Sequence, residues 1–493
     1  MSRVLLINTN IMQPPVAPIG LDYVGSALEA VGVEVALLDL AFVGAAPLRL
    51  SIENELIRGL DLHTPDVIGV TVRNTDDCCL ATHDFLLPRI GQWIATLKRH
   101  CEAPTVVGGV GFSVMPRETF TFLGADYGIA GDGEEAFPGL VEAICAGRAK
   151  KSPAGGLCYQ NRDHIPGLLW KRPDGEVAFN SPAAADPTRW PLSSRGLVDN
   201  GRYTREGGMV GIETKRGCPA GCIYCADPLA KGRRMRLRPP RVVVEEIRDL
   251  IAQGADVYHT CDSEFNLPAD HGRAVCEAIV ETGLGERIRW FAYCSPVPFD
   301  RETASLYRRA GCRGINFGCD SASNTMLARL GRDHRRSDIL AAVAATKSAG
   351  MSCMLDLLLG GPGESRESLR ETIELTRSSG ADRVGLSVGV RVYPGTPLAR
   401  EIVSYDSFQD AALTTQDFLR PYFWIEPALG DSIHNIVREL VAEDPRFFFM
   451  DPACADANYN YNDNSALVQA IQRGYRGAFW DILRRVAEGL PPE

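Results

Sequence analysis

Residues 217–225 read GCPAGCIYC, and this short loop is the strongest indication of the kind of protein that the chain forms. Cys218, Cys222 and Cys225 stand four and three residues apart, directly after the strand candidate MVGIETKR at 209–216. Two glycines and a proline keep the loop compact. Three thiolates on one such loop can hold three irons of a four-iron, four-sulfur cluster and leave its fourth iron open to another ligand.

A zinc site is the main alternative for these cysteines. Structural zinc usually takes four ligands from paired clusters. The chain has no second CxxC pair, and His259 and His271 do not have zinc-finger spacing. Most of the fifteen cysteines stand singly in apolar runs, as Cys145, Cys276 and Cys353 do, which is typical of core thiols in a reducing compartment. The cluster is therefore the favoured interpretation.

Downstream of the loop, strand and helix patterns alternate through residues 209–400. Helical stretches such as VVVEEIRDLIAQ and DILAAVAATKSAG separate the strand candidates. Six strand–helix units predict an α/β domain in the form of a partial (β/α)6 barrel, with its site at the carboxyl ends of the strands. The six strand candidates are MVGIETKRG, DVYHTCD, RIRWFAYCS, GINFGCD, CMLDLLLGG and RVGLSVGVRV.

Upstream of the loop, residues 3–145 also alternate between short apolar strands and helical patterns. This order predicts parallel βαβ units in a doubly wound, Rossmann-like sheet. Ligands of such sheets bind outside the carboxyl ends of the strands, where NTNIMQPP, TVRNTDD, GGVGFS and GDGEE would meet. The expected domains are 1–148 (doubly wound), 149–206 (a Pro/Gly-rich linker with one possible hairpin), 207–400 (barrel) and 401–493 (a small, mainly helical cap).

The charge balance excludes some function classes. The formal net charge is −10, and residues 401–493 hold seven Arg, no Lys and fifteen acidic residues. A nucleic-acid binder needs a basic face, so we expect no nucleic-acid partner. No apolar run reaches the roughly 18–20 residues that span a bilayer, and the N-terminus lacks a signal-peptide cleavage site. We expect a cytoplasmic protein with no membrane partner.

The loop, with Tyr224 before its last cysteine, resembles the radical S-adenosylmethionine superfamily. In that family the open iron binds S-adenosylmethionine, and reduction of the sulfonium releases a 5′-deoxyadenosyl radical. CDSEFN departs from the common Gly-Gly-Glu but keeps Glu264, and Asp320 replaces a glutamate. The further motifs, in the family's order, are CDSEFN (261–266), FGCDSAS (317–323), GGPGES (360–365) and VYPGTPL (392–398).

This resemblance implies that Cys218, Cys222 and Cys225 are the catalytic cluster ligands. Each further motif also has a simpler explanation: Asp262 and Glu264 as solvated carboxylates, Asp320 as a helix cap, and PGES as a helix start. Only the motifs together favour the family. The residues implied to contact S-adenosylmethionine are Tyr224, Asp262, Ser263, Glu264, Ser295, Asp320 and Ser321.

A doubly wound domain before such a barrel resembles the cobalamin-dependent subfamily, through PPVAPIGLDYVGSALEAVG, GGVGFS and GDGEEAF. The DxHxxG motif that supplies a histidine to cobalt is absent, as is typical of the subfamily. Arg73 and Asn74 are candidates for the lower face of cobalt, and a surface salt bridge of Arg73 with Asp76 or Asp77 is the alternative. The residues implied to bind cobalamin are Asn10, Arg73, Asn74, Gly108, Gly109, Gly131 and Glu134.

Two further segments each fit two interpretations. Arg236 and Arg238 follow the cluster loop, and they either counter the S-adenosylmethionine carboxylate or propionamide dipoles or are solvated. The aromatic and polar stretch FFFMDPACADANYNYNDN at 447–464 is typical of a pocket for polar small molecules, and equally of a polar turn.

The resemblance implies a cobalamin-dependent radical S-adenosylmethionine C-methyltransferase. Its cofactors would be a 4Fe-4S cluster, S-adenosylmethionine and cobalamin, and methylcobalamin would donate methyl to an unactivated carbon of a small, secondary-metabolite substrate. A flavodoxin or ferredoxin would supply electrons. An oxidative cyclase or ring-rearranging enzyme with the same cofactors is the first alternative, and a non-enzymatic cobalamin-binding module is the second.

Overall fold

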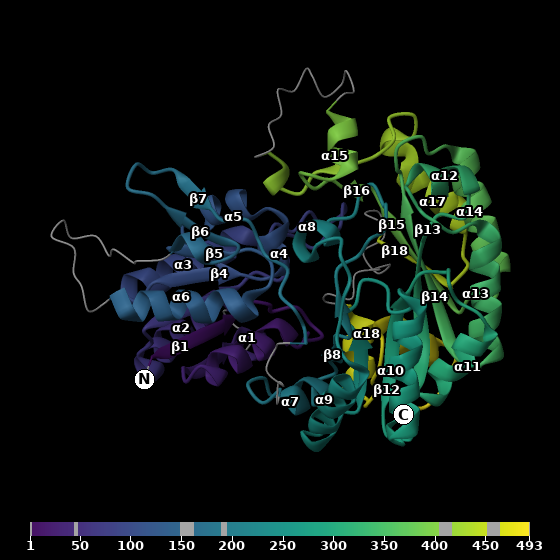
Figure 1. Ribbon diagram of the computed structural model, residues 1–493. Coiled ribbons are helices and arrows are strands. Elements are labelled where there is room, and N and C mark those ends of the chain that lie inside the picture. Colours follow the sequence, from purple (N-terminus) through teal and green to yellow (C-terminus); the bar gives the residue numbers. More distant parts are fainter. Residues whose placement is uncertain are drawn as a thin grey trace.

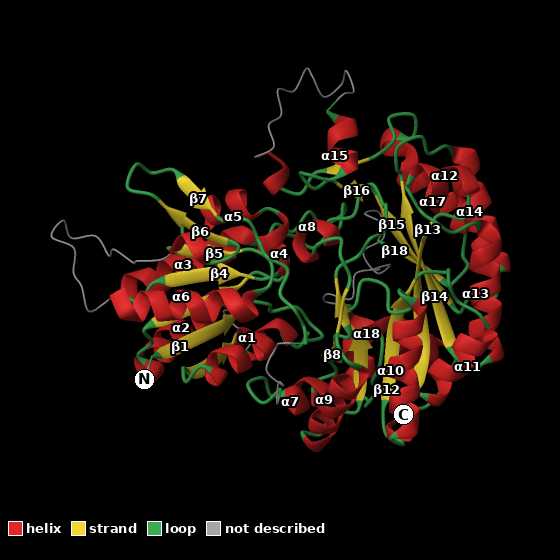
Figure 2. Ribbon diagram, in the orientation of Figure 1, coloured by secondary structure: helices red, strands yellow, loops and turns green. Residues whose placement is uncertain are grey.

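The computed structural model describes residues 2–43, 48–147, 162–188, 195–403, 417–450 and 464–492. Two large sheets lie side by side, the first in purple and blue and the second in green (Figure 1). Helices cover both faces of the first sheet and the outer face of the second (Figure 2). The expected α/β fold class, with a doubly wound domain before a parallel barrel-like sheet, is confirmed.

The first sheet has seven strands in the order β2-β1-β3-β4-β5-β6-β7, and its first five strands are parallel. Its apolar strands are buried between helices on both faces, as a parallel sheet requires. The elements are β1 (Arg3–Asn8), α1 (Ile19–Ala30), β2 (Glu34–Asp39), η1 (Leu40–Phe42), α2 (Leu48–His63), β3 (Val67–Thr71), α3 (Leu87–His100), β4 (Thr105–Gly108), α4 (Val110–Val114), α5 (Pro116–Leu123), β5 (Tyr127–Ile129), α6 (Gly133–Gly147), η2 (Arg162–His164), β6 (Leu168–Lys171) and β7 (Val177–Phe179).

The hairpin expected in the linker is present, but it belongs to the first sheet. Strand β6 pairs antiparallel with β5, and β7 pairs antiparallel with β6. Leu168 and Leu169 are fully buried, because the hairpin covers what would otherwise be the open edge of β5. The segment around β6 and β7 is therefore an extension of the first domain.

The second sheet also has seven strands, in the order β18-β15-β14-β13-β12-β11-β8, and all its pairs are parallel. Six of these strands are the expected ones, and β18 comes from the segment expected to be a helical cap. The elements are α7 (Asn200–Arg205), β8 (Val210–Ile212), β9 (Lys215–Arg216), α8 (Asp227–Lys231), β10 (Arg236–Leu237), α9 (Pro240–Ala252), β11 (Val257–Thr260), α10 (Ala269–Glu281), η3 (Leu284–Glu286), β12 (Arg289–Cys294), α11 (Arg301–Arg309), β13 (Cys312–Asp320), α12 (Asn324–Arg329), α13 (Arg336–Ser348), β14 (Ser352–Leu359), α14 (Arg366–Ser378), β15 (Arg383–Val388) and β18 (Phe447–Phe449).

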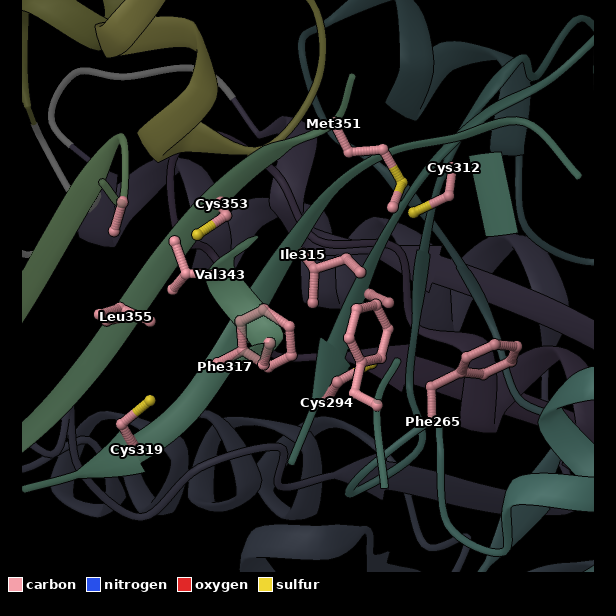
Figure 3. Close-up of a cluster of buried hydrophobic side chains, with 14 of the residues drawn as sticks. Phe265, Cys294, Cys312, Ile315, Phe317, Cys319, Val343, Met351, Cys353 and Leu355 are labelled. Carbon is pink, nitrogen blue, oxygen red and sulfur yellow. The ribbon is translucent and has the colours of Figure 1, made fainter. Parts of the chain in front are cut away.

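The main core lies between the second sheet and its outer helices (Figure 3). Along β13, Ile315, Phe317 and Cys319 face this core and are fully buried. Successive side chains of a strand point to opposite faces, so the residues between them face the interior of the barrel. Cys276 and Cys353 are buried as core thiols, as expected, and Cys145 is partly buried.

The C-terminal segment plugs the barrel instead of capping it. Gly474 and Gly477, with φ of +97° and +129°, separate its helices α18 and α19. Trp480 packs edge-on against Phe291 with ring centroids 6.0 Å apart, near the amino ends of the barrel strands. The elements are β16 (Val390–Arg391), α15 (Pro397–Ile402), η4 (Asp417–Leu419), β17 (Phe423–Trp424), η5 (Gly430–Ser432), α17 (Ile433–Val441), α18 (Ser465–Gln472) and α19 (Phe479–Ala487).

In the described ranges, no helix combines the length and the apolar character needed to cross a bilayer.

Candidate active site

The cluster loop begins directly after β9 and is held by backbone hydrogen bonds. Cys218 N donates to Gly232 O at 3.1 Å, and Ile223 N donates to Leu330 O at 3.1 Å. Gly217 has φ of +92°, and a Cβ there would lie 2.2 Å from Arg234 O. Only glycine fits this close backbone approach, so the residue before the first cysteine is fixed by packing.

The three thiols fit a cluster as their ligand set. Burial raises the pKa of Cys218 and Cys222, and it raises that of Cys225 to about 12. Soft thiols in such a setting are protonated until iron displaces the protons. No three metal-binding side chains among the described residues converge on a single ion. A four-iron cube spreads its cysteine ligands over three irons, so these sulfurs do not need to converge.

Arg332 contacts the loop, although sequence reasoning did not single it out. Its Nη1 lies 3.1 Å from Sγ of Cys222, and its side chain is 6% exposed. Its Nε lies 3.3 Å from Oδ2 of Asp320. Burial opposes the charge, but Asp320 and the other nearby acidic groups raise the pKa of Arg332 well above its ordinary value. Arg332 therefore stays cationic beside the Cys222 thiol.

Tyr224 and Asp320, both predicted site residues, form a direct contact. The Tyr224 hydroxyl donates to Oδ2 of Asp320 at 2.5 Å. Asp320 ends β13 with φ of +63°, a left-handed conformation that is unusual for a residue other than glycine. Such strain is held at functional sites by the surrounding structure. The suggestion that Asp320 caps a helix is wrong, because Ser323 is the residue that precedes α12.

Glu264 lies in the same group of side chains. Its Oε1 is 3.5 Å from Arg332 Nη2, and its Oε2 is buried with no hydrogen-bond partner in the described part of the chain. Burial raises the pKa of Glu264 to about 7, although Arg332 opposes the shift. The alternative of a solvated carboxylate is therefore wrong. An unpartnered buried oxygen is a ready acceptor for a ligand such as an ammonium group.

Asp262 also is not solvated, but it binds the protein itself. It accepts hydrogen bonds from Thr214 N at 2.8 Å, Thr214 Oγ1 at 2.5 Å and Lys215 N at 3.2 Å. These bonds brace the segment that leads into the cluster loop. Lys215 Nζ in turn donates to Glu264 O at 2.7 Å.

The three predicted serines lie in different surroundings. Ser263 Oγ donates to Oδ2 of Asp227 at 2.5 Å, beside the cluster loop. Ser295 Oγ is buried and has no hydrogen-bond partner within the described ranges. Ser321 points away into the core, where its hydroxyl lies 2.9 Å from Thr372 Oγ1 of α14. The structure thus brings Ser263 to the loop and leaves Ser321 outside the group.

On the side of the first domain, Asn10, Arg73 and Asn74 line a cavity of about 410 Å³ at the strand ends. Arg73 Nη1 lies 3.5 Å from Sδ of Met12. Burial lowers the pKa of His259 to about 4, and the Arg73 cation adds to this effect from across the domain boundary. In the described ranges Arg73 has no salt bridge, since Asp76 pairs instead with Arg391. The predicted surface salt bridge is therefore not what the structure shows.

A second cavity, of about 200 Å³, has mainly apolar walls and lies at the ends of β3, β4 and β5. Gly108, Gly109, Gly131 and Glu134 line it, as do side chains from α1 and α6. Gly109 has φ of +106°, and a Cβ there would lie 2.6 Å from Val72 O. Glycine is thus required for the close packing of the turn after β4.

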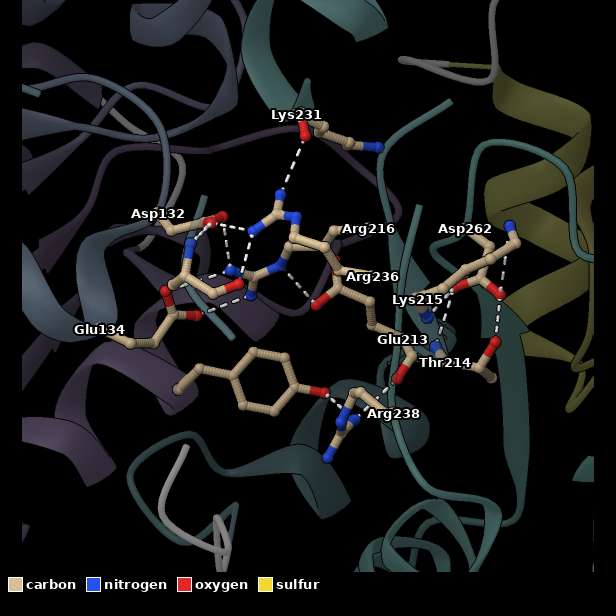
Figure 4. A network of polar contacts seen from close by, with 12 residues as sticks. Asp132, Glu134, Glu213, Thr214, Lys215, Arg216, Lys231, Arg236, Arg238 and Asp262 are labelled. Atoms are coloured by element: carbon tan, nitrogen blue, oxygen red, sulfur yellow. Dashed lines mark hydrogen bonds and ion pairs between the residues drawn. The ribbon is translucent and has the colours of Figure 1, made fainter. Parts of the chain in front are cut away.

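Arg216 and Arg236 join the two domains at this cavity (Figure 4). Arg216 pairs with Glu134 at 2.6 Å and with Asp132 at 2.9 Å, and Arg236 also pairs with Asp132. Arg236 and Arg238 are only 8% and 5% exposed, so the alternative of solvated arginines is wrong. The GDGEE turn of the first domain is thereby tied to the residue just before the cluster loop.

A second ion-pair group, fully buried, lies between α1 and α9. Arg195 Nε lies 2.7 Å from Asp22, and its Nη1 lies 2.6 Å from Glu246. Arg238 pairs with the other oxygen of Glu246 at 2.5 Å and also donates to the Tyr23 hydroxyl at 2.8 Å. Pairing of this kind is what allows several charges to be buried together.

A third cavity, of about 210 Å³, lies between the domains inside the barrel. The loop after β3 forms one wall, and the buried pair of Asp76 with Arg391 at 3.0 Å anchors that loop to the barrel. Phe479 of α19 also lines the cavity. The lining residues are Asp77, Cys78, Cys79, Leu80, Ala81, Tyr293, Asn316, Asp356, Leu386, Ser387, Val388, His434, Met450 and Phe479. The proposed polar pocket at 447–464 lies mostly outside the described residues.

Comparisons with known proteins match both halves of the chain. A model of the radical SAM superfamily matches residues 212–376, and a model of the B12 binding domain matches residues 9–141. The tryptophan 2-C-methyltransferase of Streptomyces laurentii is 30% identical, over 97% of this chain and 95% of its own length.

Solved structures agree with these matches. The radical S-adenosylmethionine methyltransferase TsrM from Kitasatospora setae, with tryptophan substrate and a SAM analog bound, has a TM-score of 0.87 at 29% identity, covering 99% of both chains. The structure of TsrM with cobalamin and a 4Fe-4S cluster bound has a TM-score of 0.85 at 29% identity, covering 99% of this chain and 98% of that one. The likeness therefore extends over both domains and the C-terminal segment.

Proposed function

Because the chain belongs to the cobalamin-dependent radical S-adenosylmethionine methyltransferases, we propose that it methylates a carbon atom of tryptophan or of a closely related indole compound. The family and the methyltransferase activity expected from the motifs are confirmed, and so are the cluster, S-adenosylmethionine and cobalamin as cofactors. The alternatives of a cyclase and of a non-enzymatic cobalamin module are thereby set aside.

The observation that carries the substrate proposal is the third cavity. It lies between the loop that follows β3, on the cobalamin side, and the inner faces of β12 to β15, on the barrel side. Its walls include Leu80, Leu386, Val388 and Phe479, which suit a flat aromatic ring. A substrate there would lie between the two cofactor-binding halves of the chain.

We further propose roles for the residues at the cluster. Cys218, Cys222 and Cys225 hold its irons, and Arg332 supports the charge of the Cys222 thiolate. When bound, the cluster and cobalamin supply electron transfer and a methyl carrier. The remaining proposed contacts to S-adenosylmethionine are those of Tyr224, Ser263, Glu264, Ser295 and Asp320, with Asp262 and Ser321 supporting their strands.

On the first domain, we propose that Asn10, Arg73 and Asn74 face the corrin, and that Gly108, Gly109, Gly131 and Glu134 shape the apolar cavity beside it. The chain's own contribution is to position the reactants and exclude water. The Arg216 and Arg236 ion pairs support this by fixing the first domain against the cluster loop.

A flavodoxin or ferredoxin in the cytoplasm is the proposed reductant, since the cluster must be reduced in use and thirteen cysteines are free in the described ranges. The proposed functional segments of the chain are 1–148, 149–206, 207–400 and 401–493. Strands β6 and β7 of the second segment join the first sheet, and β18 of the last segment joins the second sheet.

The test uses anaerobically reconstituted protein with cluster and cobalamin, supplied with S-adenosylmethionine that carries a deuterated methyl group. Tryptophan and a panel of indoles are the substrates, and mass spectrometry follows the products. We expect a deuteriomethyl group on an indole carbon, together with S-adenosylhomocysteine. Label appearing only on non-indole metabolites of an extract would contradict the proposed substrate.

A further inference from the structure

Asn316 and Asp356 form a polar pair on the inner face of the barrel. Asn316 on β13 is paired in register with Tyr293 on β12, so both side chains point into the third cavity. Asn316 Nδ2 donates to Oδ2 of Asp356 on β14 at 2.6 Å. Asn316 is 3% exposed, so this contact lies in the protein interior and not at the surface.

This bond fixes the orientation of the Asn316 amide. The amide nitrogen must face the carboxylate, because a carboxylate only accepts hydrogen bonds, so Oδ1 faces the other way. Asn316 Oδ1 is buried and has no hydrogen-bond partner in the described part of the chain. Buried carbonyl oxygens are nearly always satisfied, so the missing partner is expected to be a hydrogen-bond donor from a ligand.

The charges around the cavity indicate which donor this is. Its described lining residues include the two carboxylates of Asp77 and Asp356 and no lysine or arginine. A cationic group is therefore favoured there, and an anionic group is disfavoured. The rest of the lining is largely apolar or aromatic, so the ligand should combine a cation with an apolar ring.

Small residues flank the carboxylate. In the sheet register, Gly318 of β13 and Gly385 of β15 lie beside Asp356. A Cβ built at Gly318 would meet Arg332 Nη2 and Glu264 Oε1 at 3.7 Å, an ordinary contact distance. Asp356 itself lines the third cavity, so a ligand in the cavity can reach its carboxylate.

We propose that Asn316 and Asp356 form a subsite that receives the ammonium group of the substrate, so that the enzyme selects aromatic amines over aromatic acids. This proposal rests on the proposed function, since it assigns the same cavity to the substrate. It goes further by predicting that the amino group of tryptophan is required for binding, while its carboxylate is dispensable.

The experiment compares tryptophan, tryptamine and indole-3-propionate with the enzyme loaded with cluster and cobalamin. Equilibrium binding and turnover are measured separately. We expect tryptamine to bind within a few-fold of tryptophan, and indole-3-propionate to bind about ten- to a hundredfold more weakly, as for a lost charge-assisted hydrogen bond. In Asp356→Asn, the preference for the amines should fall by a similar factor.

A matched control is Asp256→Asn, which makes the same replacement at the amino end of β11, where Asp256 is half-exposed and pairs with Arg289. It should keep the full preference. Asn316→Ala is a second variant at the subsite; it removes the unpartnered Oδ1 and should weaken binding of tryptamine more than binding of indole-3-propionate. Cofactor absorbance and melting temperature establish that each variant is folded.

The outcomes separate the two proposals. If wild type methylates tryptophan but Asp356→Asn keeps the full preference for amines, the ammonium subsite is wrong and the proposed function stands. If no indole is methylated, the proposed function fails, and the binding preference still decides the subsite. Equal binding of tryptamine and indole-3-propionate to wild type would overturn the subsite in either case.

Discussion

The guanidinium of Arg332 lies 3.1 Å from the sulfur of Cys222 and contacts Asp320 and Glu264 on its other sides. A buried cation at a cluster ligand stabilises the more negative, reduced state of the cluster. With Cys222 as a proposed cluster ligand, Arg332 links the electronic properties of the cluster to the carboxylates proposed to bind S-adenosylmethionine.

Arg332→Gln should make the reduction potential of the cluster more negative. Loss of a group next to a ligand is expected to change the equilibrium constant for reduction by ten- to a hundredfold. For one electron, this corresponds to roughly 60–120 mV. A redox titration followed by electron paramagnetic resonance measures the shift. Arg336→Gln, which removes an exposed arginine paired with Glu371, is the control and should leave the potential unchanged. An unchanged potential in Arg332→Gln would refute this role.

Replacing any one of Cys218, Cys222 and Cys225 by serine should remove the cluster. We expect iron and sulfide content and visible absorbance to fall sharply, and turnover to fall by at least about a hundredfold. Cys145→Ser on α6, far from the loop in sequence, should retain full iron content. Iron and sulfide assays after anaerobic reconstitution make the comparison, and a fully loaded Cys222→Ser protein would argue against the assignment.

Arg195→Met should strongly destabilise the protein. The change leaves Asp22 buried without its cation, and breaking a buried pair in this way costs about 3–5 kcal/mol. Denaturant unfolding measures the loss. Arg202→Met is the control, since its pair with Glu206 is 43% and 47% exposed and should contribute less than about 1 kcal/mol. Equal effects from the two variants would contradict the importance of the buried group.

Glu364 should make stability decrease with rising pH. Burial raises its pKa to about 7, although Ser368 and Gly360 donate hydrogen bonds to the carboxylate. The folded state then holds a proton that the unfolded state loses near pH 4.3, so stability present at low pH is lost between about pH 4.3 and 7. By pH 8 the loss is about 4 kcal/mol.

Glu364→Gln should remove this dependence. We expect its melting temperature to vary less between pH 5 and 8 than that of wild type. Glu367→Gln, at a 78% exposed position of α14, should keep the wild-type slope. A Glu364→Gln slope as steep as that of wild type would show that other groups cause the pH dependence.

Phe479→Ala should change which substrates are accepted. Phe479 lines the third cavity, the proposed substrate site, from α19, and its removal enlarges the space. We expect kcat/KM for ring-substituted tryptophans to rise roughly tenfold relative to tryptophan. Phe122→Ala, at a 42% exposed position of the first domain, should leave this ratio unchanged. The competition is read by mass spectrometry of mixed substrates.

The parts of the fold that could be predicted from the sequence depend on local patterns. The cluster loop is a run of nine residues, and the apolar strands alternate with helices at regular spacing. The pairing of β18 with β15 could not be predicted in this way, because the sheet edge that β18 covers lies some sixty residues earlier in the chain.

The site residues also divide into those with a local sequence signal and those without one. Glu264 and Asp320 could be found because they belong to motifs, whereas Arg332 belongs to none. Asn316 and Asp356 are polar residues in apolar strands, and this interruption was the available signal. The pairing of Arg195 with Asp22 spans 173 residues, and no local pattern indicates such a contact.

Because α19 plugs the barrel, the size of the cavity beside it can change during evolution independently of the cofactor sites. The groups proposed to touch the cofactors sit on strand ends and loops, while the depth of the third cavity, the proposed substrate site, depends partly on a helix that carries none of them. Descendants of such an enzyme could accept larger or smaller molecules by altering that one helix, and the chemistry inherited from their ancestor would be left intact.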